Sequence, residues 1–202
     1  MNKPITTLVR KAIKSGNWII RSDNDGASIE KPDFRWSPVG QWTKAPDWDV
    51  FPACGNGLHG QGPGASGFGV AGTRTVFCMT DGQRIVIDGN KLKVPKAMIL
   101  LVNDLSTAKG LTVGGELDLS YCTGLTSLPE GLSVGGWLDL RGCTGLTSLP
   151  EGLSVGGSLD LSCCTGLTSL PEGLSVGGWL DLRGCTGLTS LPEGLKAAQG
   201  HF

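Results

Sequence analysis

The sequence predicts a small α+β domain followed by a four-coil β-solenoid, and three observations carry this prediction. A repeated unit occurs four times in the C-terminal half, starting at Val113, Val134, Val155 and Val176. Glycine supplies 33 of the 202 residues, which fits a turn-rich fold better than a helical one. The N-terminal half shows no repeat. We therefore expect residues 1–112 to form a domain that caps the solenoid, residues 113–196 to form its coils, and residues 197–202 to form a tail.

The N-terminal half carries the patterns of one helix and four strands. In residues 4–16 the apolar side chains of Ile5, Leu8, Val9 and Ile13 share one helical stripe, which ends at Gly16. Strands are expected in residues 17–22, 73–79, 83–88 and 96–102, where β-branched and other apolar residues cluster. The last of these segments leads directly into the first coil.

Each coil reads V-G-G-x-L-D-L-x-x-C-T-G-L-T-S-L-P-E-G-L-x, a period typical of one solenoid turn. In the segment WLDLR (137–141) apolar residues alternate, so Leu138 and Leu140 are expected to point inward. Trp137, Asp139 and Arg141 are then expected to point outward. The glycine pair before this strand predicts a tight turn, and the proline at position 150 excludes a helix in the return limb.

The segment LDLRGCTGLTSLPEGL resembles the leucine-rich repeat, in the short-coil form ending in Leu-Pro that occurs in bacterial and phage proteins. The resemblance covers Val113–Leu195 and implies partner contacts on the strand face. One position departs from the family, because glycine stands where the repeat has a leucine before the strand. Both a horseshoe and a flatter two-stranded β-solenoid therefore stay open.

Equivalent residues of stacked coils should form rows on the outer face, about 4.8 Å apart. Coils 1 and 3 differ together from coils 2 and 4, and residues 122–153 are identical to residues 164–195. Exposed tryptophan and arginine are typical of binding hot spots. The expected partner-binding residues are Glu116, Asp118, Trp137, Asp139, Arg141, Trp179, Asp181 and Arg183. Two plainer explanations stay open, namely recent duplication for the identity and solubility for the charged rows.

Charge separates the two halves of the chain. Residues 1–112 carry 14 Lys+Arg against 9 Asp+Glu, a net +5, whereas residues 113–202 carry 3 against 9, a net −6. The acidic repeats argue against nucleic acid as a partner, which needs a basic surface.

No apolar run approaches the ~20 residues that span a bilayer, and no signal peptide is evident, so we expect a cytoplasmic protein that does not bind membranes. Four of the seven cysteines occupy the same position in successive repeats, which favours buried repeat positions over disulfides.

A glycine-rich loop in the N-terminal half offers an alternative site. The segment CGNGLHG contains Cys54, Gly55, Gly57, His59 and Gly60, and resembles an uncharacterised domain of phage and prophage proteins. It is more faintly similar to the His-Gly motif that opens ADP-ribosyltransferase sites. Its G-x-G-x-x-G spacing lacks the strand–helix context of a dinucleotide site, and no P-loop is present. We expect no metal site, no cofactor and no catalytic residue.

The sequence thus favours a non-enzymatic protein that binds a protein partner through the repeat face. Its resemblance to phage proteins implies a host-modulating or counter-defence role. The alternative is a nucleotide-binding or ADP-ribosyltransferase-like enzyme that uses the loop at His59. Self-association through the C-terminal edge of the solenoid is a further expectation.

Overall fold

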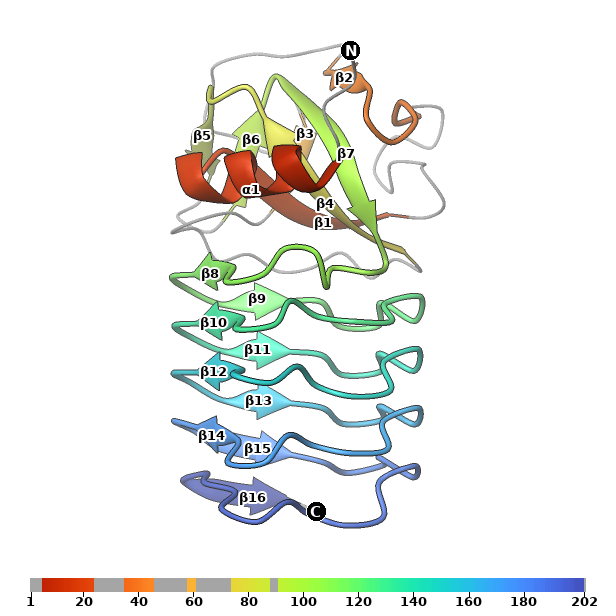
Figure 1. The fold of residues 1–202 in the computed structure, drawn as a ribbon, viewed down its shortest axis with the longest axis vertical. Coiled ribbons are helices and arrows are strands. Elements are labelled where there is room, and N and C mark those ends of the chain that lie inside the picture. Colours follow the sequence, from red (N-terminus) through yellow and green to blue (C-terminus); the bar gives the residue numbers. More distant parts are fainter. Residues whose placement is uncertain (1–4, 24–34, 46–57, 61–73, 88–90, 202) are drawn as a thin grey trace.

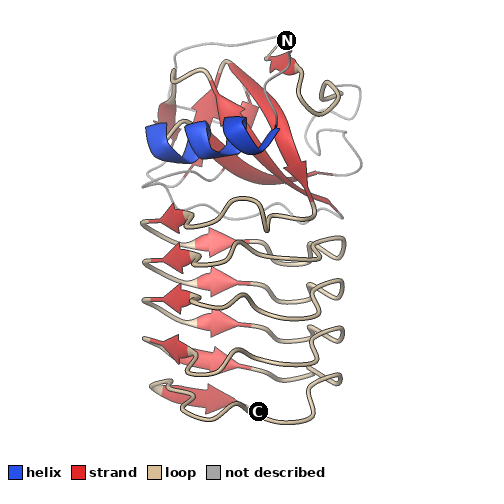
Figure 2. Ribbon diagram, viewed as in Figure 1, coloured by secondary structure: helices blue, strands red, loops and turns tan. Residues whose placement is uncertain are grey.

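The computed structural model describes residues 5–23, 35–45, 58–60, 74–87 and 91–201 (Figure 1). The N-terminal part holds the one helix of the described residues and two small sheets, and below it the chain winds into a rod of parallel coils (Figure 2). The rod extends over residues 112–201 with a 21-residue period. The predicted α+β part followed by a β-solenoid is therefore confirmed.

The N-terminal part is built around a four-stranded antiparallel sheet with the order β1-β4-β7-β2. Its strands are β1 (Trp18–Asp23), β4 (Arg74–Thr80), β7 (Lys96–Val102) and β2 (Trp42–Lys44). Helix α1 (Ile5–Ser15) buries Val9 and Ala12 in the cluster that includes Phe77 of β4. The helix ends at Gly16, whose φ of +66° is the left-handed conformation that glycine adopts without strain.

A second sheet covers the other face of the first. It consists of β3 (Leu58–Gly60), β6 (Lys91–Val94) and β5 (Ile85–Ile87), in the order β3-β6-β5. Leu58, Leu92 and Val94 pack in one cluster with Val76 and Ile99 of the first sheet. The sequence predicted α1, β1, β4, β5 and β7, but not β2, β3 or β6.

Two parallel sheets run the length of the rod, so that each coil contributes two short strands. The first sheet consists of β8 (Thr112–Val113), β10 (Ser133–Val134), β12 (Ser154–Val155) and β14 (Ser175–Val176). The second consists of β9 (Leu117–Asp118), β11 (Leu138–Asp139), β13 (Leu159–Asp160), β15 (Trp179–Asp181) and β16 (Gln199–His201). Neighbouring coils pair at equivalent positions of the repeat, as Leu138 does with Leu159. The sequence left a horseshoe and a two-stranded β-solenoid open, and the structure is a β-solenoid with two strands in each coil.

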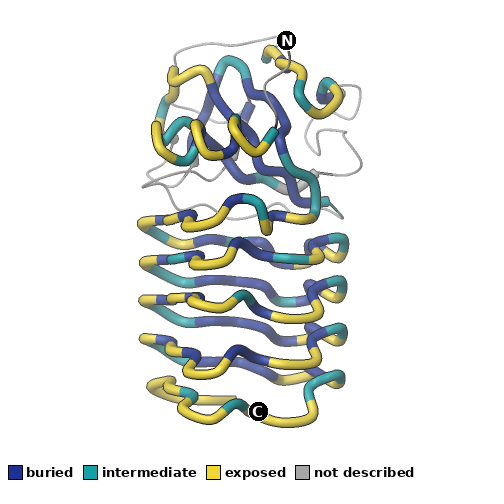
Figure 3. Tube along the Cα trace, in the orientation of Figure 1, coloured by how far each residue is buried: buried dark blue, intermediate teal, exposed yellow. Residues whose placement is uncertain are grey.

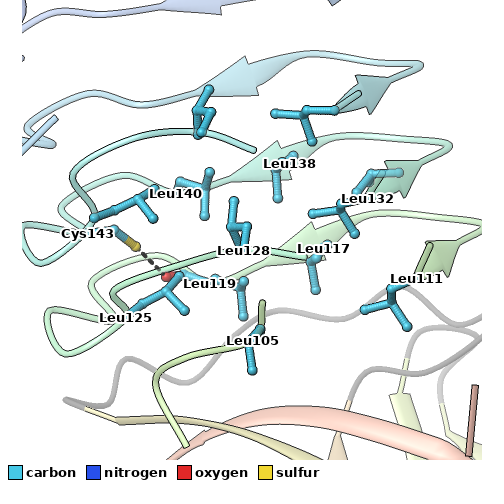
Figure 4. Packing of buried hydrophobic residues seen from close by; sticks show 14 of the residues in the cluster. Leu105, Leu111, Leu117, Leu119, Leu125, Leu128, Leu132, Leu138, Leu140 and Cys143 are labelled. Carbon is cyan, nitrogen blue, oxygen red and sulfur yellow. Dashed lines mark hydrogen bonds between the residues drawn. The ribbon is translucent and has the colours of Figure 1, made fainter. Parts of the chain in front are cut away.

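Leucine columns fill the interior of the rod (Figure 4), and the chain segments that carry them are coloured as buried in Figure 3. Leu138, Leu140 and Leu146 are fully buried, and the same cluster continues upward through Leu105 to Val9 of α1. The N-terminal part and the coils therefore share one core. The repeat cysteines are buried thiols, and Cys143 donates its S–H to the carbonyl oxygen of Leu119 at 3.0 Å (Figure 4).

The glycine pair marks the corner at which adjacent coils approach most closely. A Cβ atom at Gly156 would lie 2.4 Å from the carbonyl oxygen of Gly135, and one at Gly177 would lie 2.1 Å from that of Gly156. No side chain fits there, which explains why all four coils carry glycine at this position.

Residues 197–201, which follow the fourth coil, stay on the rod. Strand β16 pairs in parallel with β15, with Leu180 opposite Gly200 and Asp181 opposite His201. Lys196 pairs with Ser175 in the register of the repeat, whereas the pairs of β16 are shifted from that register by one position. Residues 197–201, expected as part of a tail, therefore form part of a fifth coil, which is exposed in Figure 3.

We expect Gly156→Ala to destabilise the fold by at least about 2 kcal/mol, because its Cβ would meet backbone that cannot move aside. Gly173→Ala is the matched control, since Gly173 has a φ of +67° and nothing within 4 Å of its Cβ position. It should lose only the left-handed strain of about 1 kcal/mol. Urea denaturation followed by tryptophan fluorescence measures both values, and equal losses would contradict the close-approach explanation.

Candidate partner-binding face

The sequences of the four coils vary at three positions. These positions lie at the second strand of each coil (β9, β11, β13 or β15) and in the turn that follows it. These positions hold Glu116, Ser120 and Tyr121 in coil 1; Trp137, Arg141 and Gly142 in coil 2; Ser158, Ser162 and Cys163 in coil 3; and Trp179, Arg183 and Gly184 in coil 4. We call the surface formed by these residues and the intervening aspartates the outer face. All differences between the four coils, apart from the residue that ends the last one, lie on it.

Two tryptophans form the largest apolar feature of the outer face. Trp137 and Trp179 are half-buried, and their ring centroids lie 6.0 Å apart with an interplanar angle of 56°. Two coils span about 9.6 Å, so the rings lean toward each other over the smaller Ser158 of the intervening coil. The Oγ of Ser158 accepts a hydrogen bond from the Trp179 backbone N–H at 3.2 Å. The two rings thus form one continuous aromatic patch.

The aspartate row is not exposed as the sequence predicted. Asp139 and Asp181 are only 4% and 2% exposed, and Asp160 is also buried. In every coil one carboxylate oxygen accepts the backbone N–H two residues later, as Asp160 does from Ser162 at 2.8 Å. These Asx turns end the strand, so Asp139 and Asp181 are structural residues beneath the face.

Each arginine of the face is held by the aspartate of its own coil. The Nη2 atom of Arg141 lies 2.9 Å from Oδ2 of Asp139, and Arg183 contacts both carboxylate oxygens of Asp181. The Arg183 side chain nevertheless stays 68% exposed. Both guanidinium groups are therefore fixed at one edge by a buried acid while they face solvent.

Sequence reasoning missed Tyr121, which is 50% exposed at the edge of the face. The Arg141 guanidinium lies 5.6 Å from the centroid of its ring, a cation–π contact. Tyr121 has a φ of +58° where Gly142 and Gly184 occupy the same turn. A bulky residue at a glycine position of the repeat was the signal that could have identified it.

The two buried aspartates differ in the sign of their pKa shift. Burial raises the pKa of Asp139, against the opposing effects of the Arg141 backbone N–H and guanidinium. The hydrogen bond from the Arg183 side chain lowers the pKa of Asp181, against the effect of burial. Arg183 therefore compensates its carboxylate more fully than Arg141 does.

The alternative loop site is described only in part. Cys54, Gly55 and Gly57 lie outside the described residues, whereas His59 and Gly60 form part of β3. His59 is the register partner of Lys93 in β6, and Lys93 is a charged residue that is only 1% exposed. The structure thus places a buried lysine on the strand beside His59.

Two kinds of site find no support in the described part of the chain. None of its helices has the length and apolar character needed to cross a bilayer. Among the same residues, no group of three or more His, Cys, Asp or Glu side chains gathers to hold a metal ion.

Comparison with known proteins found no matching family model, no similar curated protein and no similar solved structure.

Replacing each buried aspartate by asparagine keeps an oxygen for the Asx turn and removes the charge. In the unfolded chain an aspartate has a pKa of about 3.9, and the pKa of Asp139 is raised in the folded protein. Its ionisation therefore lowers the free energy of unfolding as the pH rises above about 3.9. Asp139→Asn should therefore gain stability relative to the wild type between pH 3 and pH 7. The pKa of Asp181 is lowered in the folded protein, so its ionised form stabilises the wild type above about pH 3.9 and this stabilisation is lost on acidification. Asp181→Asn should therefore lose stability relative to the wild type between pH 3 and pH 7.

Urea denaturation of the wild type and both variants at the two pH values measures these differences. A third variant, Asp139→Ala, also removes the oxygen that accepts the Arg141 N–H and should be less stable than Asp139→Asn by about 1 kcal/mol. Parallel pH responses of the two asparagine variants would refute the contrast between the two sites.

Proposed function

We propose that this chain is a non-enzymatic interaction protein that binds a protein partner through the outer face of its solenoid. The observation that carries the proposal is the confinement of coil-to-coil differences to this face. There the sequence places Trp137, Trp179, Arg141, Arg183 and Tyr121, which are the residue types that dominate binding hot spots.

The geometry supports a face that is organised before a partner arrives. The aromatic rings already contact each other, and the guanidinium groups are held by buried acids. Ordering a long side chain on binding loses about 0.5–1.5 kcal/mol, a loss that this arrangement reduces. Asp139 and Asp181 then act as positioning residues for the arginines, whereas Glu116 borders the aromatic patch.

The proposal extends to the setting in which the protein works. The resemblance to leucine-rich repeats supports partner contacts on the strand face, and the resemblance to phage proteins supports a phage-encoded, host-modulating or counter-defence role. The net charge of −6 in residues 113–202 supports a partner other than nucleic acid. We place this activity in the cytoplasm, without a membrane contact.

Trp137→Ala combined with Trp179→Ala should abolish partner capture, because both anchors of the aromatic patch are removed. The experiment isolates bound proteins from the native host with tagged wild-type chain, identifies them by mass spectrometry, and repeats the capture with the purified candidate. Trp42→Ala is the control, since Trp42 is 39% exposed on β2, outside the solenoid. Equal capture by the double variant and the control would refute the proposal, provided circular dichroism shows both chains folded.

The N-terminal part supports a second candidate, a nucleotide-binding or ADP-ribosyltransferase-like activity at the loop that ends in β3. The supporting observation is that His59 and Gly60 of the CGNGLHG segment form strand β3, which places His59 in register with Lys93 of β6.

A thermal shift screen against NAD, ADP-ribose and cyclic dinucleotides tests this candidate. A bound nucleotide at about 100 times its Kd should stabilise the wild type by about 2.7 kcal/mol. His59→Ala should show no such stabilisation. No shift in the wild type, or the same shift in both proteins, would rule out a nucleotide site at this position.

A further inference from the structure

Strand β16 adds a fifth level to the outer face (Figure 1). Its register with β15 places Gln199 beside Trp179 and His201 beside Asp181, and all three residues of β16 are exposed. The row of residues that begins with Glu116 and holds both tryptophans therefore continues to Gln199. We call it the tryptophan row. The aspartate row beside it ends in His201.

The two ends of the tryptophan row differ in charge. At coil 1 Glu116 is exposed and forms no ion pair with another described residue. Its Cγ lies against the corner before Trp137, since a Cβ at Gly136 would come within 3.2 Å of that atom. At coil 4 the guanidinium of Arg183 is held over the aspartate row by Asp181, and the Arg183 side chain is 68% exposed. The row thus runs from an acid at coil 1 to a cation beside coil 4.

The second arginine of the face does not cancel this polarity. Arg141 is engaged on two sides, because its Nη2 atom lies 2.9 Å from Oδ2 of Asp139 and its guanidinium lies 5.6 Å from the centroid of the Tyr121 ring. Its side chain is 41% exposed, against 68% for Arg183. Arg183 is therefore the arginine of the face that is more available to a partner.

The spacing along the tryptophan row matches that of an extended chain. Coils about 4.8 Å apart place coil 5 about 19 Å from coil 1. The rings of Trp137 and Trp179 lean toward each other over coil 3, and with centroids 6.0 Å apart they lie about 7 and about 13 Å from coil 1. Alternate residues of an extended chain are about 6.6 Å apart, so its first, third, fifth and seventh residues reach about 0, 7, 13 and 20 Å. One side of a seven-residue segment therefore meets the acid, the two rings and the cationic end in turn.

We infer that the outer face binds an extended segment of its partner along the tryptophan row, with a basic side chain at Glu116, two apolar side chains on the indole rings and an acidic side chain at Arg183 and His201. The inference rests on the proposed function, because it states the chemistry of the partner at the same face. The apolar side chains cover the half-buried rings, and the opposite charges fix which end of the segment lies at coil 1, since the reverse orientation brings like charges together.

The contact is small, which sets the expected strength. Seven residues bury much less than the roughly 1,200 Å² of total area that stable complexes reach, so we expect a Kd between about 10 and about 1,000 µM. Both charged contacts lie near solvent, so about 0.5 M NaCl should weaken binding further.

A blocked, fluorescent peptide of seven residues tests the inference. It carries lysine first, leucine third and fifth, glutamate last and threonine at the positions between. Fluorescence anisotropy with the full chain at up to about 1 mM measures its Kd. Replacing either the lysine or the glutamate by glutamine should raise the Kd about threefold, as expected for an exposed ion pair. Trp137→Ala combined with Trp179→Ala should abolish binding.

Substitutions at the two ends of the row test the orientation. Glu116→Lys should bind the lysine peptide more weakly and prefer a peptide with glutamate at both ends. Arg183→Gln should no longer distinguish glutamate from glutamine at the last position. Glu151→Lys is the matched control, because Glu151 is exposed on coil 2 outside the outer face and undergoes the same change of charge.

A wild type that does not bind the peptide would overturn the inference. The same peptide preference in Glu116→Lys and Glu151→Lys would also overturn it, because the charge at coil 1 would then have no specific role. Tryptophan-dependent capture of a folded partner by a wild type that ignores the peptide would still support the proposed function, so the two can fail separately.

Discussion

The close approach of backbone at the glycine corner is the constraint on which the solenoid depends. The carbonyl oxygen of one coil occupies the space where a Cβ of the next would lie, as at Gly135 and Gly156. This contact lets the strands on both sides of the corner pair in register, with Val134 opposite Val155 and Leu138 opposite Leu159. Once that register is set, every side chain stacks on its equivalent in the next coil. The leucine columns, the buried cysteines and the rows of the outer face all follow from it.

The row of stacked aspartates is electrostatically unfavourable, yet each aspartate makes a hydrogen bond that the end of its strand needs. Four carboxylates one strand spacing apart repel one another, and this repulsion contributes to the raised pKa of Asp139 through Asp118 and Asp160. Each carboxylate is retained because it accepts a backbone N–H that would otherwise be unsatisfied where the strand ends. Arginines in alternate coils then offset part of the charge and are themselves oriented. The carboxylates of Asp139 and Asp181 therefore both end their strands and orient the guanidinium groups of Arg141 and Arg183.

The sequence predicted the coils well because their period repeats four times, and each repeat tests the same inward and outward assignment. It did not predict the second strand of each coil, since a two-residue strand such as Ser133–Val134 has no alternation to detect. Its prediction that Asp139 is exposed was wrong, because the alternation of apolar residues gives the direction of a side chain but does not show which neighbouring groups cover it. Tyr121 was missed as a member of the face for a different reason, namely that its importance lies in its φ of +58° and its contact with Arg141.

Recent duplication alone explains why the coils are identical at exposed positions such as Thr123 and Thr144, which packing does not constrain. It does not explain why the differences that have accumulated all fall on one face. The interior cannot vary, because a change at Leu146 or at Gly156 would leave a cavity or cause a clash. The exposed turns could vary and have not. Variation limited to three positions of the outer face, which differ in size and charge from coil to coil, is the pattern expected when that face is the part of the rod that meets another surface.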